Sequence, residues 1–364
     1  MKTIASWMIV VIVLLLGGLA GVSFWVSQPL FKHTLDPAIL EDITIAPASE
    51  ALTFARATVD GMPHLLLVMQ YRGNNVIGVD LNTRLNIRET DPILLFRRLG
   101  YAALEAESTS IANMVAVDAE LLDVPFAALE HNIGIGLNYT EHARESGLDE
   151  QPFVFPKFAQ PTPAGSAIER NDSTRLDYEA ELGFVALDPI AAAEPIPATM
   201  GLVLANEMTD RWALVRNFKR GTAMGATGFA DGKSRAGFAP LGNLFVIPRD
   251  LERFYKSIEL RLYLNGRLRQ HETVGAMAWG PRQMLNEIFR RADEEFEYQG
   301  GVTPLLNAGS ALAAGSIIFS GTPAGVIFRP VNLWNPWIYL QPGDEVVIRA
   351  DYLGVIRNRI TASD

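Results

Sequence analysis

The stretch "LDYEAELGFVAL", Leu176–Leu187, alternates charged and apolar residues before it enters a continuous apolar run. Successive side chains of a β-strand point to opposite faces, so Glu179 and Glu181 would project from one face of this predicted strand. Two neighbouring carboxylates repel each other, and on a strand that enters a core they need a compensating cation. The simpler interpretation of the pair alone is a solvated strand face.

A third carboxylate follows in "LANEMTDR", where Glu207 could add its oxygen to those of the first two. Three carboxylates make a candidate site for a hard cation such as Mg²⁺ or Mn²⁺. The chain contains no cysteine, which excludes disulfides, thiolate nucleophiles and cysteine-ligated zinc. Any metal must therefore be held by oxygen or imidazole.

A histidine with a nearby carboxylate occurs in "NYTEHARESG". On a short helix that begins near Tyr139, His142 and Glu145 are three residues apart and face each other. A carboxylate on one imidazole nitrogen fixes the tautomer and raises the basicity of the other nitrogen, as a general base for water requires. For an isolated pair the alternative is a surface His–Glu contact.

Composition limits the classes of function. The 364 residues are 49% hydrophobic and 20% charged, as expected for a globular chain with a large core. Lys and Arg number 31 against 41 Asp and Glu, a formal net charge of −10, which argues against nucleic acid as a partner. Small molecules and metal cations are the expected ligands.

Most of the chain has the pattern of short strands. Apolar or alternating runs such as "LFVIP", "IELRLYLNG" and "DEVVIRADYLG" are separated by Gly and Pro. One long amphipathic helix is predicted over Pro281–Tyr298, with Pro in its first turn. We therefore expect a mainly β (α+β) fold with few helices, and no nucleotide-binding strand–GxGxxG–helix unit.

The N-terminus differs from the rest of the chain. Residues 4–26 carry no charge and are long enough to cross a hydrocarbon core about 30 Å thick. A cleavable signal peptide is the alternative, but Phe24, Trp25 and Val26 stand where small residues would be needed. Lys2 precedes the span and acidic residues follow it, which favours a single-pass membrane protein with its body on the non-cytoplasmic side.

The predicted organisation has four parts. Residues 1–27 form the transmembrane anchor and residues 28–43 a tether with two prolines. Residues 44–125 form a small N-terminal β-rich domain, and residues 126–364 form the larger domain that holds the candidate site residues.

Five segments in order resemble the C-terminal catalytic domain of the fumarylacetoacetate hydrolase family, and together they span about residues 133–360. They are "GIGLNYTEHARESG", "FPKFAQPTPAGSAIERNDSTRLDYEAELGFV", "NEMTDR", "GKSRAGFAPLGNLFV" and "AAGSIIFSGTPAGVIF…LQPGDEVVIRADYLGVIRNRI". The resemblance implies a β-rich, barrel-like roll with a metal at its mouth. It also suggests a homodimer.

Specific roles follow from the resemblance position by position. It implies one Mg²⁺ or Mn²⁺ per chain, held by Glu179, Glu181 and Glu207. It makes His142 and Glu145 the water-activating pair and Lys233 the residue that stabilises the enolate or oxyanion. The substrate-binding positions that it implies are Tyr139, Arg211, Gly321 and Thr322.

The sequence departs from the family at two of these places. Glu207 stands where the family has aspartate, and its extra methylene moves the carboxylate by about 1.5 Å. The segment between Arg211 and Lys233 is glycine-rich and lacks the family's glutamine after the arginine.

The activity implied is hydrolysis of a C–C bond in a β-dicarbonyl or acylpyruvate-type 2-oxo acid through a metal-bound enolate. β-Keto acid decarboxylation and keto–enol isomerisation use the same enolate and stay open as alternatives. So does a non-catalytic binding module whose metal site has degenerated.

Overall fold

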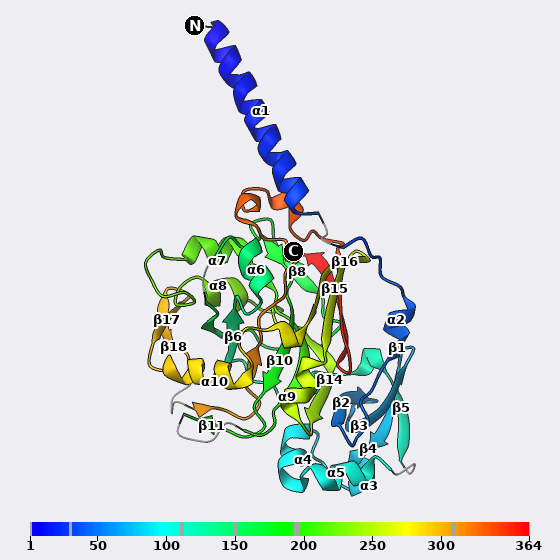
Figure 1. Cartoon of the computed structure of the whole chain (residues 1–364). Helices are drawn as coiled ribbons and strands as arrows, with labels where there is room; N and C mark the ends of the chain where they lie inside the picture. Colours follow the sequence, from blue (N-terminus) through cyan, green and yellow to red (C-terminus); the bar gives the residue numbers. More distant parts are fainter. Residues whose placement is uncertain are drawn as a thin grey trace.

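Two β-sheets form the body of the protein, which we describe from a computed structural model (Figure 1). The structure describes residues 2–28, 31–109, 113–148, 151–192, 197–306 and 311–363. Residues 29 and 30 of the predicted tether lie outside these ranges, as does Met1 of the predicted anchor. The sheet-rich α+β prediction is confirmed.

The larger sheet has eleven strands in the order β5-β4-β3-β2-β14-β12-β10-β20-β6-β7, with β1 paired to β3. Neighbouring strands are antiparallel except β20 and β6, which run parallel. Its strands are β1 (Asp42–Ile43), β2 (Ala51–Val59), β3 (Met62–Arg72), β4 (Asn75–Asp80), β5 (Met114–Asp118), β6 (Asn132–Gly136), β7 (Phe153–Lys157), β10 (Ala180–Val185), β12 (Gly201–Asn206), β14 (Leu241–Pro248) and β20 (Ile317–Phe319).

A five-stranded sheet, in the order β16-β15-β21-β22-β8, packs against the larger one. It contains β8 (Ile168–Arg170), β15 (Glu259–Leu264), β16 (Arg267–Thr273), β21 (Glu345–Ala350) and β22 (Gly354–Ala362). Three two-stranded pairs complete the β-structure: β9 (Leu176–Asp177) with β13 (Thr209–Asp210), β11 (Ile190–Ala191) with β19 (Ala311–Leu312), and β17 (Glu295–Tyr298) with β18 (Gly301–Pro304).

The core explains why the central strands lack a simple alternation. Every residue of β10, β12 and β14 is buried, because the larger sheet is covered on both faces at these strands. Strands buried on both faces read as continuous apolar runs. Glu181 in β10 is therefore a carboxylate inside the core, and the solvated-face interpretation does not hold for it.

The helices are short, apart from the first. They are α1 (Lys2–Val26), α2 (Ala38–Glu41), α3 (Leu81–Leu85), α4 (Pro92–Leu99), α5 (Tyr101–Glu107), α6 (Thr140–Glu145), α7 (Arg211–Asn217), α8 (Phe229–Lys233), α9 (Leu251–Lys256) and α10 (Pro281–Arg290), with 3₁₀ turns η1 (Ala119–Leu121), η2 (Val274–Ala276), η3 (Pro330–Asn332) and η4 (Pro336–Ile338).

The helix predicted over residues 281–298 is wrong in its second half. Helix α10 ends at Arg290, and β17 pairs with β18 through a turn at Gln299 and Gly300, both at positive φ. Phe296 is buried while its neighbour Glu295 is exposed, which is the two-residue period of a strand. The helical spacing ends at Phe289, and the acidic residues that follow carry no periodic signal.

Strands from residues 51–80 continue the sheet that holds β10, β12 and β14, because β2 pairs with β14. Helices α3 to α5 follow these strands, between β4 and β5. Asp80 caps α3, and Asp91 caps α4 directly before Pro92. Both residues are ordinary helix-start signals that the β-rich interpretation of this region did not use.

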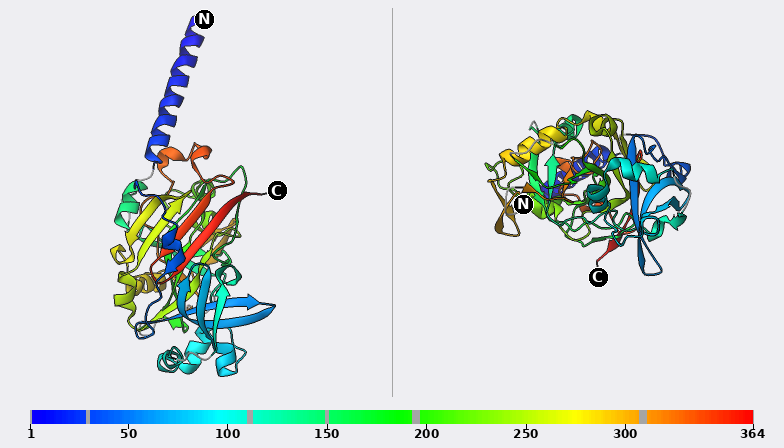
Figure 2. Two further views of the ribbon diagram at one scale, coloured as in Figure 1. Left: turned by 90° about the vertical axis from the view of Figure 1, so that its right-hand side faces the viewer. Right: turned by 90° about the horizontal axis from the view of Figure 1, so that it is seen from below.

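Helix α1 projects away from the body (Figures 1 and 2). From Trp7 to Val26 it is almost wholly exposed and is long and apolar enough to cross a membrane, a test that a signal sequence also passes. Its C-terminal end meets the loop of η3 and η4. Ser23 is buried there, and Asn335 Nδ2 donates to Ser23 Oγ at 3.3 Å.

Candidate active site

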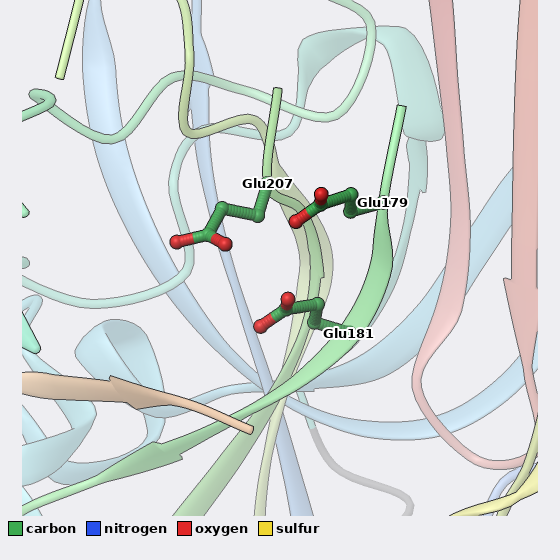
Figure 3. Close-up of side chains that lie close together, drawn as sticks. All are labelled: Glu179, Glu181 and Glu207. Carbon is green, nitrogen blue, oxygen red and sulfur yellow. The ribbon is translucent and has the colours of Figure 1, made fainter. Parts of the chain in front are cut away.

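Three buried glutamates converge at the centre of the larger sheet (Figure 3). Glu179 directly precedes β10, Glu181 lies within it, and Glu207 directly follows β12. Because Ala180 pairs with Asn206 across the two strands, these positions are brought side by side. One carboxylate oxygen from each residue lies within 4.8 Å of the others. The longer side chain at position 207 thus reaches the group.

Two cations hold Glu179. Arg211 begins α7, and its guanidinium bonds Glu179 Oε1 through Nη2 and Asp177 Oδ2 through Nε, the latter at 2.8 Å. Lys233 ends α8, and its Nζ bonds Glu179 Oε2 and lies 2.7 Å from Glu207 Oε2. Burial alone would raise the pKa of Glu179, but Arg211 and Lys233 lower it to about 2.

Glu181 has no such cation in direct contact within the described residues. Its Oε2 accepts a hydrogen bond from the Gly321 backbone N–H at 3.0 Å. Burial, followed by the charges of Glu207 and Glu179, raises the pKa of Glu181 well above its ordinary value. Gly321 has φ +85°, and a Cβ there would lie 2.9 Å from both Asn138 Cβ and Ile135 O. Only glycine fits this close approach.

Lys157 in β7 is a buried charge to which the sequence interpretation gave no role. Its Nζ donates to the carbonyls of Lys233, at 2.6 Å, and Phe238, at 3.1 Å, and lies 3.6 Å from Glu207 Oε1. Burial lowers the pKa of Lys157 to about 8 although Glu207 opposes the shift. A lysine within the apolar run "FVFPKF" was the available signal, because lysine is almost never fully buried without a partner.

His142 and Glu145 form the predicted pair on α6. The His142 Nδ1 lies 2.9 Å from Glu145 Oε1, and each side chain is 9% exposed. Glu145 is itself held by the Gly325 N–H, at 3.1 and 3.0 Å from its two oxygens, and by Arg329 Nη2 at 2.5 Å. With Nδ1 engaged, Nε2 is the ring nitrogen available for proton transfer. Arg329 was not predicted from the sequence.

One cavity of about 530 Å³ lies at this site, and Glu207, Glu145, Lys157 and Arg329 are outside its lining. Its lining includes Glu179, Glu181, His142, Arg211, Lys233 and Thr322.

Two predicted substrate-binding residues lie elsewhere. Tyr139 is buried outside this lining, and its hydroxyl has no partner among the described residues. Gly321 acts through its backbone, by holding Glu181.

The residues present fit a divalent cation. Glu207 Oε1 is buried without a hydrogen-bond partner in the described structure, although the Lys157 ammonium lies 3.6 Å away. The converging donors are all carboxylate oxygens, the ligands of hard cations such as Mg²⁺ and Mn²⁺. Lys233 Nζ now satisfies two of these carboxylates, so a bound cation would compete with it.

The model of the family described as fumarylacetoacetate (FAA) hydrolase C-terminal matches residues 131–361. The chain is 26% identical over 313 residues to the mitochondrial oxaloacetate tautomerase FAHD2B of Bos taurus. The matched region covers 82% of this chain and 87% of the bovine protein. The resemblance seen in the five sequence segments is thereby confirmed.

Solved structures share the fold. The fumarylacetoacetate hydrolase of Exiguobacterium antarcticum matches with a TM-score of 0.62 at 21% identity, over 86% of this chain and 100% of that one. A 5-carboxymethyl-2-hydroxymuconate delta-isomerase from Mycobacterium smegmatis matches with a TM-score of 0.57 at 17% identity and the same coverage.

Proposed function

The chain belongs to the fumarylacetoacetate hydrolase family, and we propose that it is a divalent-metal-dependent hydrolase of a C–C bond in a β-dicarbonyl or acylpyruvate-type 2-oxo acid. The observation that carries the proposal is the shared cavity. Glu179 and Glu181, two of the three carboxylates suited to a hard cation, line the same space as a histidine oriented as a general base.

The roles of the residues follow from their contacts. When bound, a divalent cation would polarise the substrate oxygens as a Lewis acid. His142 Nε2 takes a proton from the attacking water, and Glu145 stabilises the resulting imidazolium because its position is fixed by Arg329 and Gly325.

Cleavage of the C–C bond leaves its electron pair on the departing fragment as an enolate. Lys233, which lines the cavity, donates a hydrogen bond to the enolate oxygen. To do so it must leave Glu179 or Glu207, and cation binding to those carboxylates favours that release. The proton held by His142 then returns to the enolate carbon, which restores the neutral imidazole.

Keto–enol tautomerisation is the second candidate. The name of the bovine relative favours it, as does the fact that His142 could move a proton between carbon and oxygen without an attacking water. Decarboxylation of a β-keto acid would pass through the same enolate. A binding module would show metal binding without turnover of any of these substrates.

The test is a direct comparison of three reactions with the purified full chain and Mg²⁺ or Mn²⁺. Acylpyruvate hydrolysis is followed by loss of diketone absorbance, oxaloacetate enol-to-keto conversion by loss of enol absorbance, and decarboxylation by released CO₂. Hydrolysis that is faster than the other two, and that is lost in His142→Ala, supports the proposal. Tautomerisation without hydrolysis assigns the second candidate, and saturable metal binding with no turnover refutes both.

We also propose that α1 anchors the protein in a membrane as a single-pass helix, with the body on the non-cytoplasmic side. Support comes from the exposed apolar surface of α1 and from the loop at its base, where Trp334 and Trp337 are 42% and 81% exposed. Tryptophan is enriched at membrane interfaces.

A further inference from the structure

We infer that the cavity takes an amphiphilic substrate, whose 2-oxo acid or β-dicarbonyl head lies at the glutamates and whose apolar chain fills the rest. The inference rests on the proposed function for the head group. It adds the chemical class of the substituent that lies beyond the cleaved or isomerised bond. The observations for this substituent come from the outer part of the cavity.

The cavity is larger than a head group needs. Its volume of about 530 Å³ falls in the range of roughly 300–1,000 Å³ that is typical of pockets for drug-sized ligands. A head group of about nine non-hydrogen atoms would fill at most about half of it, if each atom took the roughly 30 Å³ of one liquid water. The remaining space needs an occupant.

The wall beside the glutamates is aromatic. Phe153, Phe155 and Phe229 line the cavity and contact one another, with ring centroids 4.7 Å apart for Phe153 and Phe229 and 5.4 Å apart for Phe155 and Phe229. Lys233 Nζ lies 5.7 Å from the Phe155 ring centroid, so this wall begins next to the proposed chemistry. An apolar chain that leaves the head group would contact these rings.

The glycines of β6 make room for this wall. Phe155 pairs with Gly134 and Phe153 with Gly136 across β6 and β7. A Cβ at Gly134 would lie 2.2 Å from the Phe155 ring, and one at Gly136 would lie 2.1 Å from the Phe153 ring. The rings therefore lie over the glycine backbone, where any larger residue would displace them.

The glycine-rich segment after α7 supplies the facing surface. Phe218 and Met224 of this segment line the cavity and are only half-buried, and Leu148 lines it from the segment after α6. Gly225 has φ +87°, and a Cβ there would lie 2.3 Å from Val154 O, so the segment is packed directly against β7. Water in the cavity contacts these apolar side chains, and covering them with an apolar ligand is favourable because apolar surface is removed from water.

Polar groups in the lining outside the head-group site are Ser146 and Arg220. Arg220 is exposed, and a distal carboxylate on the substrate could pair with it. An alkyl chain and a chain that ends in a carboxylate are therefore the two occupants that the experiment has to separate.

The experiment measures binding of N-alkyl oxamates, which mimic the enolate of a 2-oxo acid, to the Mg²⁺-loaded full chain in lipid nanodiscs by calorimetry. Empty nanodiscs are the blank. From N-ethyl to N-hexyl oxamate the affinity should rise about fourfold per methylene, the factor for complete burial of each group. An N-(carboxyalkyl) oxamate of equal length should bind at least about tenfold more weakly, because its charge would enter an apolar space.

Two variants localise the effect. Met224→Asp and, independently, Leu148→Asp should abolish the dependence on chain length while N-ethyl oxamate binds as before. Met62→Asp, on an exposed methionine of β3 outside the cavity, is the matched control and should leave the dependence intact.

An affinity that is independent of chain length, or tighter binding of the carboxyalkyl probe, overturns the inference and leaves the proposed function standing. Failure of N-ethyl oxamate itself, with Mg²⁺ bound, overturns the proposed function and the inference with it.

Discussion

Glu179 and Glu181 are two residues apart yet differ in what balances their charge. Arg211 and Lys233 contact Glu179 directly, whereas Glu181 receives one backbone N–H from Gly321. Their pKa values therefore shift in opposite directions, down to about 2 for Glu179 and well above the ordinary value for Glu181. A buried carboxylate with a raised pKa keeps its proton until a stronger positive charge arrives.

Cation binding should therefore release a proton from Glu181. A divalent cation binds the ionised carboxylate, so affinity should increase as the pH rises from the ordinary glutamate pKa to the raised one. Calorimetry of Mg²⁺ binding in buffers of different ionisation enthalpy measures the number of protons released. A value near one per ion at a pH below the raised pKa is expected, and zero at every pH would mean that Glu181 is not a ligand.

Lys233 should weaken cation binding in the resting protein, because it holds two of the three carboxylates. Lys233→Met should tighten Mg²⁺ binding by roughly tenfold or more, since the repulsion between two positive charges about 4 Å apart is several kcal/mol at an effective dielectric constant of 20. Turnover should fall in the same variant. Lys219→Met, on an exposed lysine of the segment after α7, is the control. Weaker cation binding in Lys233→Met would contradict this competition.

His142→Ala should slow hydrolysis by about 10²–10⁴-fold, the usual range for a positioned acid–base group. Glu145→Gln should cost less, because an amide still accepts from the ring but cannot stabilise its charged form. Metal affinity should not change, since the three glutamates lie on other segments of the chain. Single-turnover rates at saturating Mg²⁺ test both variants, and a His142→Ala enzyme that binds metal and hydrolyses normally would remove the proposed base.

At the level of residues, spacing in the sequence predicted which side chains meet within one element. The i,i+2 glutamates and the i,i+3 His142–Glu145 pair needed only strand and helix geometry. Arg329 and Lys157 were missed because their partners, Glu145 and Glu207, lie far away in the sequence. Such pairs depend on the topology, which no local pattern encodes.

At the level of elements, β6 and β7 show how an ordinary glycine pattern serves the site. The segment "IGIGLN" gives glycine at alternate positions, and the sequence alone predicted only a strand there. Its partner strand supplies the rings that occupy the missing side-chain volume. The same dependence on a partner explains the error over residues 295–298, which pair with β18 although their composition suits a helix.

Gly136→Ala should destabilise the fold by about 1–3 kcal/mol, the usual cost of overpacking a core. The added methyl would lie 2.1 Å from the Phe153 ring, so the ring must move into the cavity. Thermal unfolding measures the loss, and cavity binding should weaken with it. Gly165→Ala, where a Cβ meets nothing within 4 Å, is the control. Equal melting temperatures for both variants would show that the Phe153 ring moves aside without loss of stability, which would contradict the prediction.

At the level of the whole molecule, the N-terminal strands and the strands beside the three glutamates form one sheet, while α1 stands apart from both (Figure 2). The apolar composition of residues 4–26 predicted a long helix, and the structure contains it as α1. The sequence could not show that the end of this helix would meet the η3–η4 loop. That loop directly follows Arg329, which holds Glu145, so the segment that contacts the base of α1 also contacts the proposed catalytic pair.

If α1 spans a membrane, the full-length protein should stay with the membrane fraction through high-salt and alkaline washes, because a buried apolar helix of this length is not released by either. A chain that begins at Thr34 should appear in the soluble fraction. Trp337→Ser should leave the full-length protein in the membrane fraction, since the helix and not the loop would be the anchor. Cleavage of the body by protease added outside intact cells would assign it to the non-cytoplasmic side. A mature protein that starts after about residue 27 would instead identify a signal peptide, and the anchor would be lost from the proposal.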